Sequence, residues 1–250
     1  MTVRHELNGD VGVLTLARPE KRNALTPEML IQFTEGVGSL IDRGARVLLV
    51  TGEGRVFCSG FDLALCIADP GGDTMRSLLT GLDTAIRVMR EAPTPVVLAA
   101  HGAAIAGGCA MLGGADVVVS DEQAKLGYPV VRIGVSPAVS APFLTAQGGP
   151  AAARSRMLDP GLTTGRGAFA SGWVQELVAT ETDVLPRASE IANELATKPS
   201  WAITATKALL NDLTTPPHGG SGLAASLALT GGSEERELLA RAMAPKDHNP

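Results

Sequence analysis

The chain has 250 residues, of which 45% are hydrophobic and 19% charged, and its net charge is −5. This length and apolar content suffice for one buried core, and the lack of a Lys/Arg cluster argues against a nucleic-acid partner. The N-terminus has no signal-peptide core. The longest uncharged run, 92–115, contains prolines and five glycines, so we expect no membrane span. Three cysteines without a Cys-x-x-Cys pair favour a cytoplasmic location and argue against a disulfide scaffold or a zinc site.

Strands and helices are expected to alternate through the first half of the chain. Residues 11–16 predict a strand, and a helix should run from Pro27 to about Arg43, with Thr26 as its N-cap. The later apolar runs predict strands buried on both faces. The remaining elements are expected at 46–52 (strand), 74–91 (helix), 94–102 (strand), 106–116 (short helix) and 116–120 (strand).

The last hundred residues have a mostly helical pattern. Breaks are expected at Pro160, Pro186 and Pro199, and the final seven residues are expected to fray. Strands that alternate with helices indicate an α/β fold with parallel pairing. We therefore divide the chain into an α/β core, 1–190, and a C-terminal helical oligomerisation region, 191–250.

Two segments share one design, in which a buried strand is followed by small residues that lead into a turn or helix. They are "CSGFD" (58–62) and "HGAAIAGGCAM" (101–111). Glycine lets a ligand approach the backbone closely, and the first amide hydrogens of a helix have no partner within it. Two such amides, one from each segment, would form an oxyanion hole for a polarised carbonyl. Two tight turns in which glycine only relieves crowding explain the same residues.

Four motifs in this order resemble the crotonase superfamily of enoyl-CoA hydratases and isomerases. "RPEKRNAL" (18–25) is similar to the family's first CoA-contacting loop, "VFCSGFDL" (56–63) and "HGAAIAGGCAML" (101–112) to its oxyanion segments, and "AFASGWV" (168–174) to a downstream segment. The resemblance implies the ClpP/crotonase spiral fold with a C-terminal helical region, assembled as a homotrimer or homohexamer. It also implies an acyl-CoA ligand that brings its own coenzyme A, with no separate cofactor and no metal.

The resemblance assigns roles to particular residues. The backbone N–H groups of Phe61 and Gly107 would be the two oxyanion donors. Asp62 is expected to hold the turn through local hydrogen bonds. Lys21 or Arg22 could meet a phosphate, or belong to a solvated charged loop. The positions expected to contact substrate are Ala24, Leu25, Ser59, Gly60, Asp62, Leu63, Gly108 and Tyr128.

The sequence departs from the family at the two glutamates that position and activate water in its hydratases. These positions hold Ala110 and Val130, and neither side chain can transfer a proton, a loss typically worth about 10²–10⁴-fold in rate. His101 is better explained as structural. Tyr128 is a poor base at its ordinary pKa of about 10, although its hydroxyl could orient a ligand. Cys109 could act as a nucleophile at a helix N-terminus, but ordinary hydratases of the family often have a cysteine there.

Two functions remain open. The protein could be an acyl-CoA-binding enzyme of hydratase or isomerase type whose hydratase activity is weak or altered. Alternatively, it could be a non-catalytic acyl-CoA-binding protein that has lost the chemistry. The replaced residues at 110 and 130 favour the second function, and the intact oxyanion segments fit both.

Overall fold

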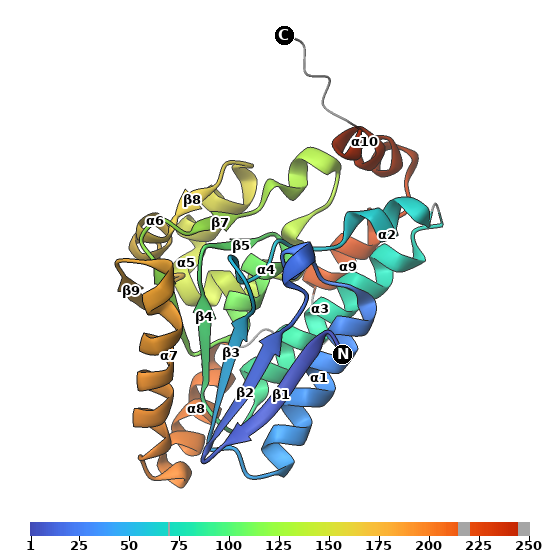
Figure 1. Cartoon of the computed structure of the whole chain (residues 1–250). Coiled ribbons are helices and arrows are strands. Elements are labelled where there is room, and N and C mark those ends of the chain that lie inside the picture. The colour runs from blue at the N-terminus through green and yellow to red at the C-terminus, as the bar shows by residue number, and fades with distance from the viewer. Residues whose placement is uncertain (70, 215–220, 245–250) are drawn as a thin grey trace.

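A six-stranded sheet forms the centre of the molecule (Figure 1). The computed structural model describes residues 1–69, 71–214 and 221–244. The strand order is β1-β2-β3-β4-β6-β9, with β1 antiparallel to β2 and each later neighbouring pair parallel, which confirms the predicted α/β class. The strands are Val3–Asn8 (β1), Val11–Leu16 (β2), Val47–Gly52 (β3), Val96–Ala100 (β4), Val117–Asp121 (β6) and Glu176–Val178 (β9).

Helices surround this sheet and make up most of the C-terminal part of the chain (Figure 1). Four 3-10 helices occur among the described residues: Pro19–Lys21 (η1), Met111–Gly114 (η2), Pro129–Ile133 (η3) and Pro137–Val139 (η4). The α-helices are Pro27–Asp42 (α1), Leu63–Ala68 (α2), Asp73–Glu91 (α3), Gly107–Ala110 (α4), Ala141–Leu158 (α5), Gly165–Ala170 (α6), Glu181–Ala196 (α7), Ser200–Thr214 (α8), Ser221–Ala228 (α9) and Ser233–Met243 (α10).

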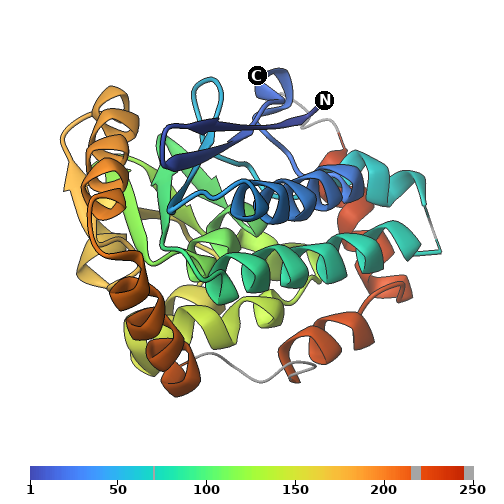
Figure 2. The ribbon, with the colours of Figure 1, turned by 90° about the horizontal axis from the view of Figure 1, so that it is seen from below.

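The central strand β3 is buried on both faces, as its uninterrupted apolar sequence predicts. Leu48 and Val50 pack with α1 and α3 on one face, whereas Val47 and Leu49 pack with α7 on the other. Side chains alternate along a strand, so a strand covered on both faces needs apolar residues at successive positions. Figure 2 shows α1 and α3 side by side, with α7 apart from them across the sheet.

A smaller sheet of three strands brings the two predicted oxyanion segments together. It consists of β5 (Ala103–Ile105), β7 (Lys125–Gly127) and β8 (Thr163–Thr164), in the order β5-β7-β8. The segment after β3 joins its edge through a parallel bridge between Cys58 and Ala104. The chain therefore leaves the carboxyl ends of β3 and β4 along two neighbouring paths.

The C-terminal helices turn back onto the core. α9 contacts α3 and η4, and α10 contacts α2 and η3. α7 runs to Ala196 and packs on β3, β4 and β6, so this helix continues across the predicted division at residues 190 and 191. The division into core and oligomerisation region stays a prediction.

Several elements differ from the sequence-based expectations. β1 and α2 were not predicted, and α5 begins before residue 150, with a kink at Gly149 (φ 82°, ψ 162°) that accommodates Pro150. The expected break at Pro186 is wrong, because this proline lies inside α7. It stands near the start of that helix, and a proline there removes one backbone hydrogen bond while packing on the sheet and a capping box at Thr180 stabilise the helix. The tail expected to fray lies outside the described residues, apart from Ala244.

Lys207 links α8 to the core through an ion pair and two hydrogen bonds. Its ammonium side chain is 6% exposed and lies 2.7 Å from Oδ2 of Asp116. It also donates to the carbonyls of Met89 (3.1 Å) and Thr94 (2.9 Å). Burial lowers the pKa of Lys207, and the neighbouring Asp116 carboxylate opposes that shift.

We expect Lys207→Ala to lower the free energy of unfolding by about 3 kcal/mol, because it leaves a partly buried carboxylate without its counterion. Chemical denaturation measures this change. Lys198→Ala is the control, since Lys198 forms an exposed pair with Glu194 that is worth at most about 1 kcal/mol. Equal effects of the two variants would contradict an anchoring role for Lys207.

Candidate active site

The two oxyanion segments run side by side and are held by backbone hydrogen bonds. The N–H of Phe57 donates to the carbonyl of His101 (2.9 Å), and the N–H of Ile105 donates to the carbonyl of Cys58 (2.9 Å). Gly60 follows with a φ of +97°. A Cβ at Gly60 would lie 3.0 Å from the Cβ of Ala106, so the close approach of the two segments requires glycine at this position.

The second turn contains a strained residue directly before its predicted donor. Ala106 has φ 51° and ψ −112°, a region that L-residues other than glycine rarely adopt. Its N–H donates to the carbonyl of Gly127 (2.9 Å), and its carbonyl accepts from Ala110 (2.9 Å). These two bonds fix the conformation that starts α4 at Gly107.

The two residues that carry the predicted donors are in contact. A Cβ placed at Gly107 would be 3.1 Å from Cε1 of Phe61, so the Phe61 ring packs on this glycine. Among the described residues, no hydrogen bond uses the N–H of Phe61 or of Gly107. The helix cannot satisfy the latter, since the first N–H groups of a helix lack an intrahelical acceptor.

Both residues line a cavity of about 570 Å³. Its wall also holds Ala110 and Val130, the positions of the missing glutamates, and is mostly apolar. The ionisable side chains on the described wall are Tyr128, Arg132 and Arg241, without a carboxylate, imidazole or thiol. The wall is therefore suited to an uncharged group that presents an oxygen to the two amides.

The structure brings seven of the predicted site residues together on this wall and leaves five outside it. Of those five, Leu25 is buried behind Gly107, with its Cδ1 3.2 Å from a Cβ placed there, and a Cβ at Gly108 would lie 2.6 Å from the carbonyl oxygen of Cys58. Both residues pack against the turns without lining the cavity. On the wall are Ser59, Phe61, Leu63, Gly107, Ala110, Tyr128 and Val130; outside it are Ala24, Leu25, Gly60, Asp62 and Gly108.

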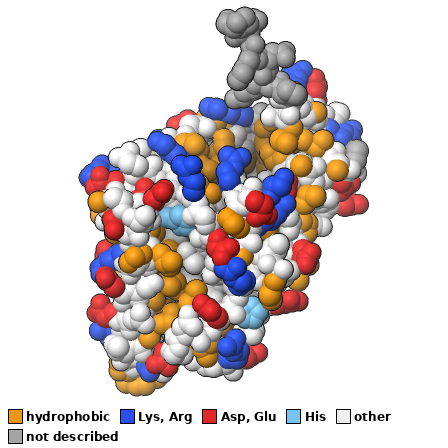
Figure 3. Space-filling view, in the orientation of Figure 1, with side chains coloured by type: hydrophobic (Ala, Val, Ile, Leu, Met, Phe, Trp, Pro, Cys, Tyr) orange, Lys and Arg blue, Asp and Glu red, His pale blue; other side chains and the backbone are white. Residues whose placement is uncertain are grey.

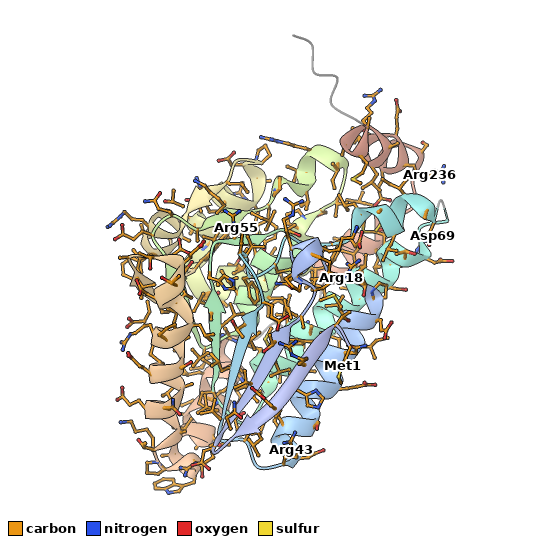
Figure 4. The ribbon with its side chains drawn as sticks, in the orientation of Figure 1. Met1, Arg18, Arg43, Arg55, Asp69 and Arg236 are labelled. Carbon is orange, nitrogen blue, oxygen red and sulfur yellow. The ribbon has the colours of Figure 1, made fainter. Side chains whose placement is uncertain are left out.

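Asp62 was expected to hold the turn through local hydrogen bonds, but its side chain caps no N–H of α2. Its carboxylate lies 2.8 Å from Nη1 of Arg18, in an ion pair whose side chains are 14% and 18% exposed. Figure 4 labels both Arg18 and Arg55 near the upper end of the sheet. The ion pair joins the loop 18–25 to the first oxyanion turn, which a search for partners close in sequence could not reveal.

Asn23 joins the same two segments from inside. It is fully buried with a φ of 54°. Its Oδ1 accepts from the N–H of Arg18 (2.9 Å), and its Nδ2 lies 2.8–3.0 Å from the carbonyls of Glu53, Val56 and Phe57. Asn23 therefore satisfies several otherwise unpaired backbone groups at the start of the site.

The candidate proton-transfer groups are placed unfavourably for that chemistry. His101 is outside the cavity wall, and its Nε2 lies 3.1 Å from the carbonyl of Gly54, which fits the structural interpretation. Burial raises the pKa of the Cys109 thiol to about 12, so the thiolate that a nucleophile requires is not populated near neutral pH. Burial also raises the pKa of Tyr128 well above its ordinary value.

The hydroxyl of Tyr128 lies behind the cavity wall. Ser140 and Cys109 are its polar neighbours, yet no group among the described residues reaches it with hydrogen-bond geometry. The Tyr128 ring packs edge-on against Trp173, with centroids 6.2 Å apart. Tyr128 thus contributes its ring to the wall and remains a neutral phenol.

Sequence reasoning missed two walls of the cavity. α3 contributes Met75, Leu79 and Leu82, and α10 contributes Leu238, Arg241 and Ala242. The spacing of the α3 residues predicts an apolar helix face but not which surface it covers. α10 reaches the site only through the return of the chain onto α2, which has no local sequence signal.

The site lies at the carboxyl ends of two parallel strands, where two glycine-containing turns meet beside an apolar cavity. This arrangement defines a crotonase fold, as predicted, and solved structures share it. The enoyl-CoA hydratase/isomerase of Xanthobacter autotrophicus Py2 superposes with a TM-score of 0.86 at 27% identity, over 97% of this chain and 93% of that one. Pseudomonas aeruginosa OdaA gives a TM-score of 0.82 at 25% identity, over 97% of this chain and 99% of that one.

The chain belongs to the enoyl-CoA hydratase/isomerase family, whose sequence profile matches residues 6–231. A Thermus thermophilus protein provisionally named an enoyl-CoA hydratase is 34% identical over 205 residues, 81% of each chain. The 1,2-epoxyphenylacetyl-CoA isomerase of Escherichia coli is 30% identical over 210 residues, 82% of this chain and 80% of that one. These matches confirm the family inferred from the four motifs.

Two further observations concern partners of other kinds. No helix in the described part of the chain has the length and apolar content needed to cross a membrane. Over the same residues, no group of three or more His, Cys, Asp or Glu side chains is placed to hold a metal ion.

Proposed function

We propose that the protein binds acyl-CoA thioesters, with the thioester carbonyl held between the N–H groups of Phe61 and Gly107. The observation that carries this proposal is that Phe61 and Gly107, whose N–H groups make no hydrogen bond among the described residues, are in contact and line one apolar cavity. Membership of the enoyl-CoA hydratase/isomerase family supports the ligand class. The ligand would bring its own coenzyme A and need no separate cofactor, and the cysteine content supports a cytoplasmic location.

Basic side chains near the site support binding of the coenzyme A phosphates. Lys21, Arg22, Arg55 and Arg132 are exposed, and none of them forms an ion pair with another described residue. Figure 3 shows Lys and Arg side chains gathered over the upper part of the face in view, next to hydrophobic atoms. Phosphate groups would find cations there that no protein carboxylate already neutralises.

The reaction is the open part of the function. We propose that hydration of enoyl-CoA is weak or altered, because Ala110 and Val130 stand where a water would need two carboxylates. The second candidate is a non-catalytic acyl-CoA-binding protein. The described cavity wall has no carboxylate, imidazole or thiol, and burial raises the pKa of its one tyrosine, Tyr128. This lack of an acid or base suited to proton transfer favours the second candidate.

Replacement of Gly107 tests the thioester site. Gly107→Pro removes one donor N–H, whereas Gly107→Ala keeps it and adds a Cβ against the same Phe61 ring. We expect the proline variant to lose about 1 kcal/mol, or roughly fivefold, of the preference for butanoyl-CoA over free CoA that the alanine variant retains. Calorimetric titration of folded variants measures both affinities. Equal affinity of the unmodified protein for the two ligands would refute the proposed site.

We further propose that the protein assembles in a multiple of three subunits. α8 exposes Trp201 (77%), Leu209 (60%), Leu210 (52%) and Leu213 (72%), and exposed apolar patches of this kind mark protein contacts. Sedimentation equilibrium at micromolar concentration is expected to give a trimer or hexamer. Leu213→Glu should weaken the assembly if α8 forms the contact, and a monomeric unmodified protein would contradict the proposal.

A further inference from the structure

A second cavity lies against the first, with a thin wall between them. It has a volume of about 610 Å³ and is bordered by η4, α5 and the end of α9. Three consecutive residues, Val135, Ser136 and Pro137, line both cavities. A single stretch of chain therefore separates the apolar space beside Phe61 and Gly107 from the second apolar space.

The second cavity is lined mostly by apolar residues, with Arg154 as the charged side chain on its described lining, and it therefore suits a hydrocarbon chain. Ala141, Ala153 and Met157 of α5 form much of its surface. Leu158 and Leu229 stand at its open side, where they are 69% and 56% exposed. An apolar tail could thus be covered along its length while its end reaches the solvent.

The segment that separates the two cavities is held by contacts with α9. The hydroxyl of Ser226 donates to the carbonyl of Ser136 (3.1 Å), and a Cβ at Gly222 would lie 2.3 Å from the carbonyl oxygen of Ala138. Two further side-chain bonds hold this stretch: the N–H of Ala138 donates to Oγ of Ser136 (3.3 Å), and the hydroxyl of Ser140 donates to the carbonyl of Pro137 (3.1 Å). The described hydrogen bonds of this stretch therefore lie within residues 130–140 or reach α9, and none of them belongs to the large sheet.

We infer that the two cavities form one binding channel for the acyl chain, and that the ligand is a long-chain fatty acyl thioester. This inference rests on the proposed function, because the chain must start at a thioester held by Phe61 and Gly107. The head of the chain fills the first cavity, and the tail crosses the wall at residues 135–137 into the second. Because residues 135–137 line both cavities, the second cavity directly adjoins the thioester site, which favours an acyl tail as the occupant over a second copy of the protein.

The chain-length dependence of affinity tests the channel. Each newly buried methylene strengthens binding by about fourfold, so the affinity of saturated acyl-CoAs should keep rising from butanoyl to tetradecanoyl. Calorimetric titration below the micellar concentration of each ligand gives the series. A rise that stops once the first cavity is full would overturn the inference.

Variants that fill the second cavity provide the decisive comparison. Thr145→Phe and Ala141→Phe each place a ring on a position that lines only the second cavity. We expect both to weaken tetradecanoyl-CoA binding at least tenfold and butanoyl-CoA binding less than twofold. Thr84→Phe is the matched control, because Thr84 borders a separate groove between α1 and α3. Val135→Ala should have the opposite effect on the long chain, since it thins the wall.

Each outcome has one meaning. Identical chain-length series for the unmodified protein and both filled variants would refute the channel. Loss of assembly in the filled variants, with no change in that series, would show the second cavity to be a contact between copies and would also refute it. If butanoyl-CoA binds no better than free CoA, the proposed function fails at its own site, whereas butanoyl-CoA binding without a gain from longer chains counts against the channel alone.

Discussion

Crotonyl-CoA is expected to be hydrated at least about a hundredfold more slowly than the turnover of roughly 10 per second typical of enzymes. Hydration needs a group that deprotonates the attacking water and one that protonates C2, and each such group contributes about 10²–10⁴-fold. Ala110 and Val130 line the cavity where those groups would act, and neither can exchange a proton. The loss of the enoyl absorbance, followed at high protein concentration, measures the residual rate.

A matched reference is the doubly substituted protein with Ala110→Glu and Val130→Glu, which restores two carboxylates to the cavity and should hydrate faster than the unmodified chain. A turnover of the unmodified protein within tenfold of ordinary enzymes would show that another group activates water. Tyr128 would then be replaced first, because it lines the cavity and His101 does not.

Val130→Glu alone is expected to create measurable isomerisation of 3-enoyl-CoA to 2-enoyl-CoA. This reaction needs one base, which removes a proton from C2 and returns it at C4 while the two amides hold the enolate oxygen. Val130 lies on the wall that also carries those amides. The apolar surroundings should raise the pKa of the new carboxyl, and a base near neutral pH is then available.

The cost of this substitution is a carboxyl group in an apolar wall, about 1–3 kcal/mol of stability. Val130→Gln is the control, because glutamine has a shape and polarity similar to those of glutamate but cannot accept the proton from C2. A folded glutamate variant that binds acyl-CoA like the unmodified protein and shows no isomerase activity above the glutamine variant would refute the assignment of position 130.

Much of the core was predictable because its signals are local. Thr26 caps α1, with its Oγ1 accepting from the N–H of Met29 (3.2 Å). The three residues Thr-Pro-Glu are enough to predict this helix start. The buried strands β3, β4 and β6 follow from unbroken apolar runs. β1 was missed because it lies at the edge of the sheet and alternates polar with apolar residues, a weaker signal in a short segment.

The site itself was predictable only where a turn needs a special backbone. Gly60, with its φ of +97°, and the glycines that open α4 leave such a mark in the sequence. The ion pair between Arg18 and Asp62, the covering helix α10 and the second cavity leave none. They depend on residues far apart in sequence whose meeting is decided by the path of the chain, which no local pattern encodes.

The buried amide of Asn23 has a consequence for how this region opens. Since the Asn23 side chain bonds the backbone of both the loop 18–25 and the segment 53–57, we expect these two segments to loosen together. Their backbone amides should exchange with solvent as one cooperative unit. A fluctuation of one segment is thereby coupled to the other, and Phe61, which follows segment 53–57 in the chain, keeps its position as long as Asn23 holds both segments.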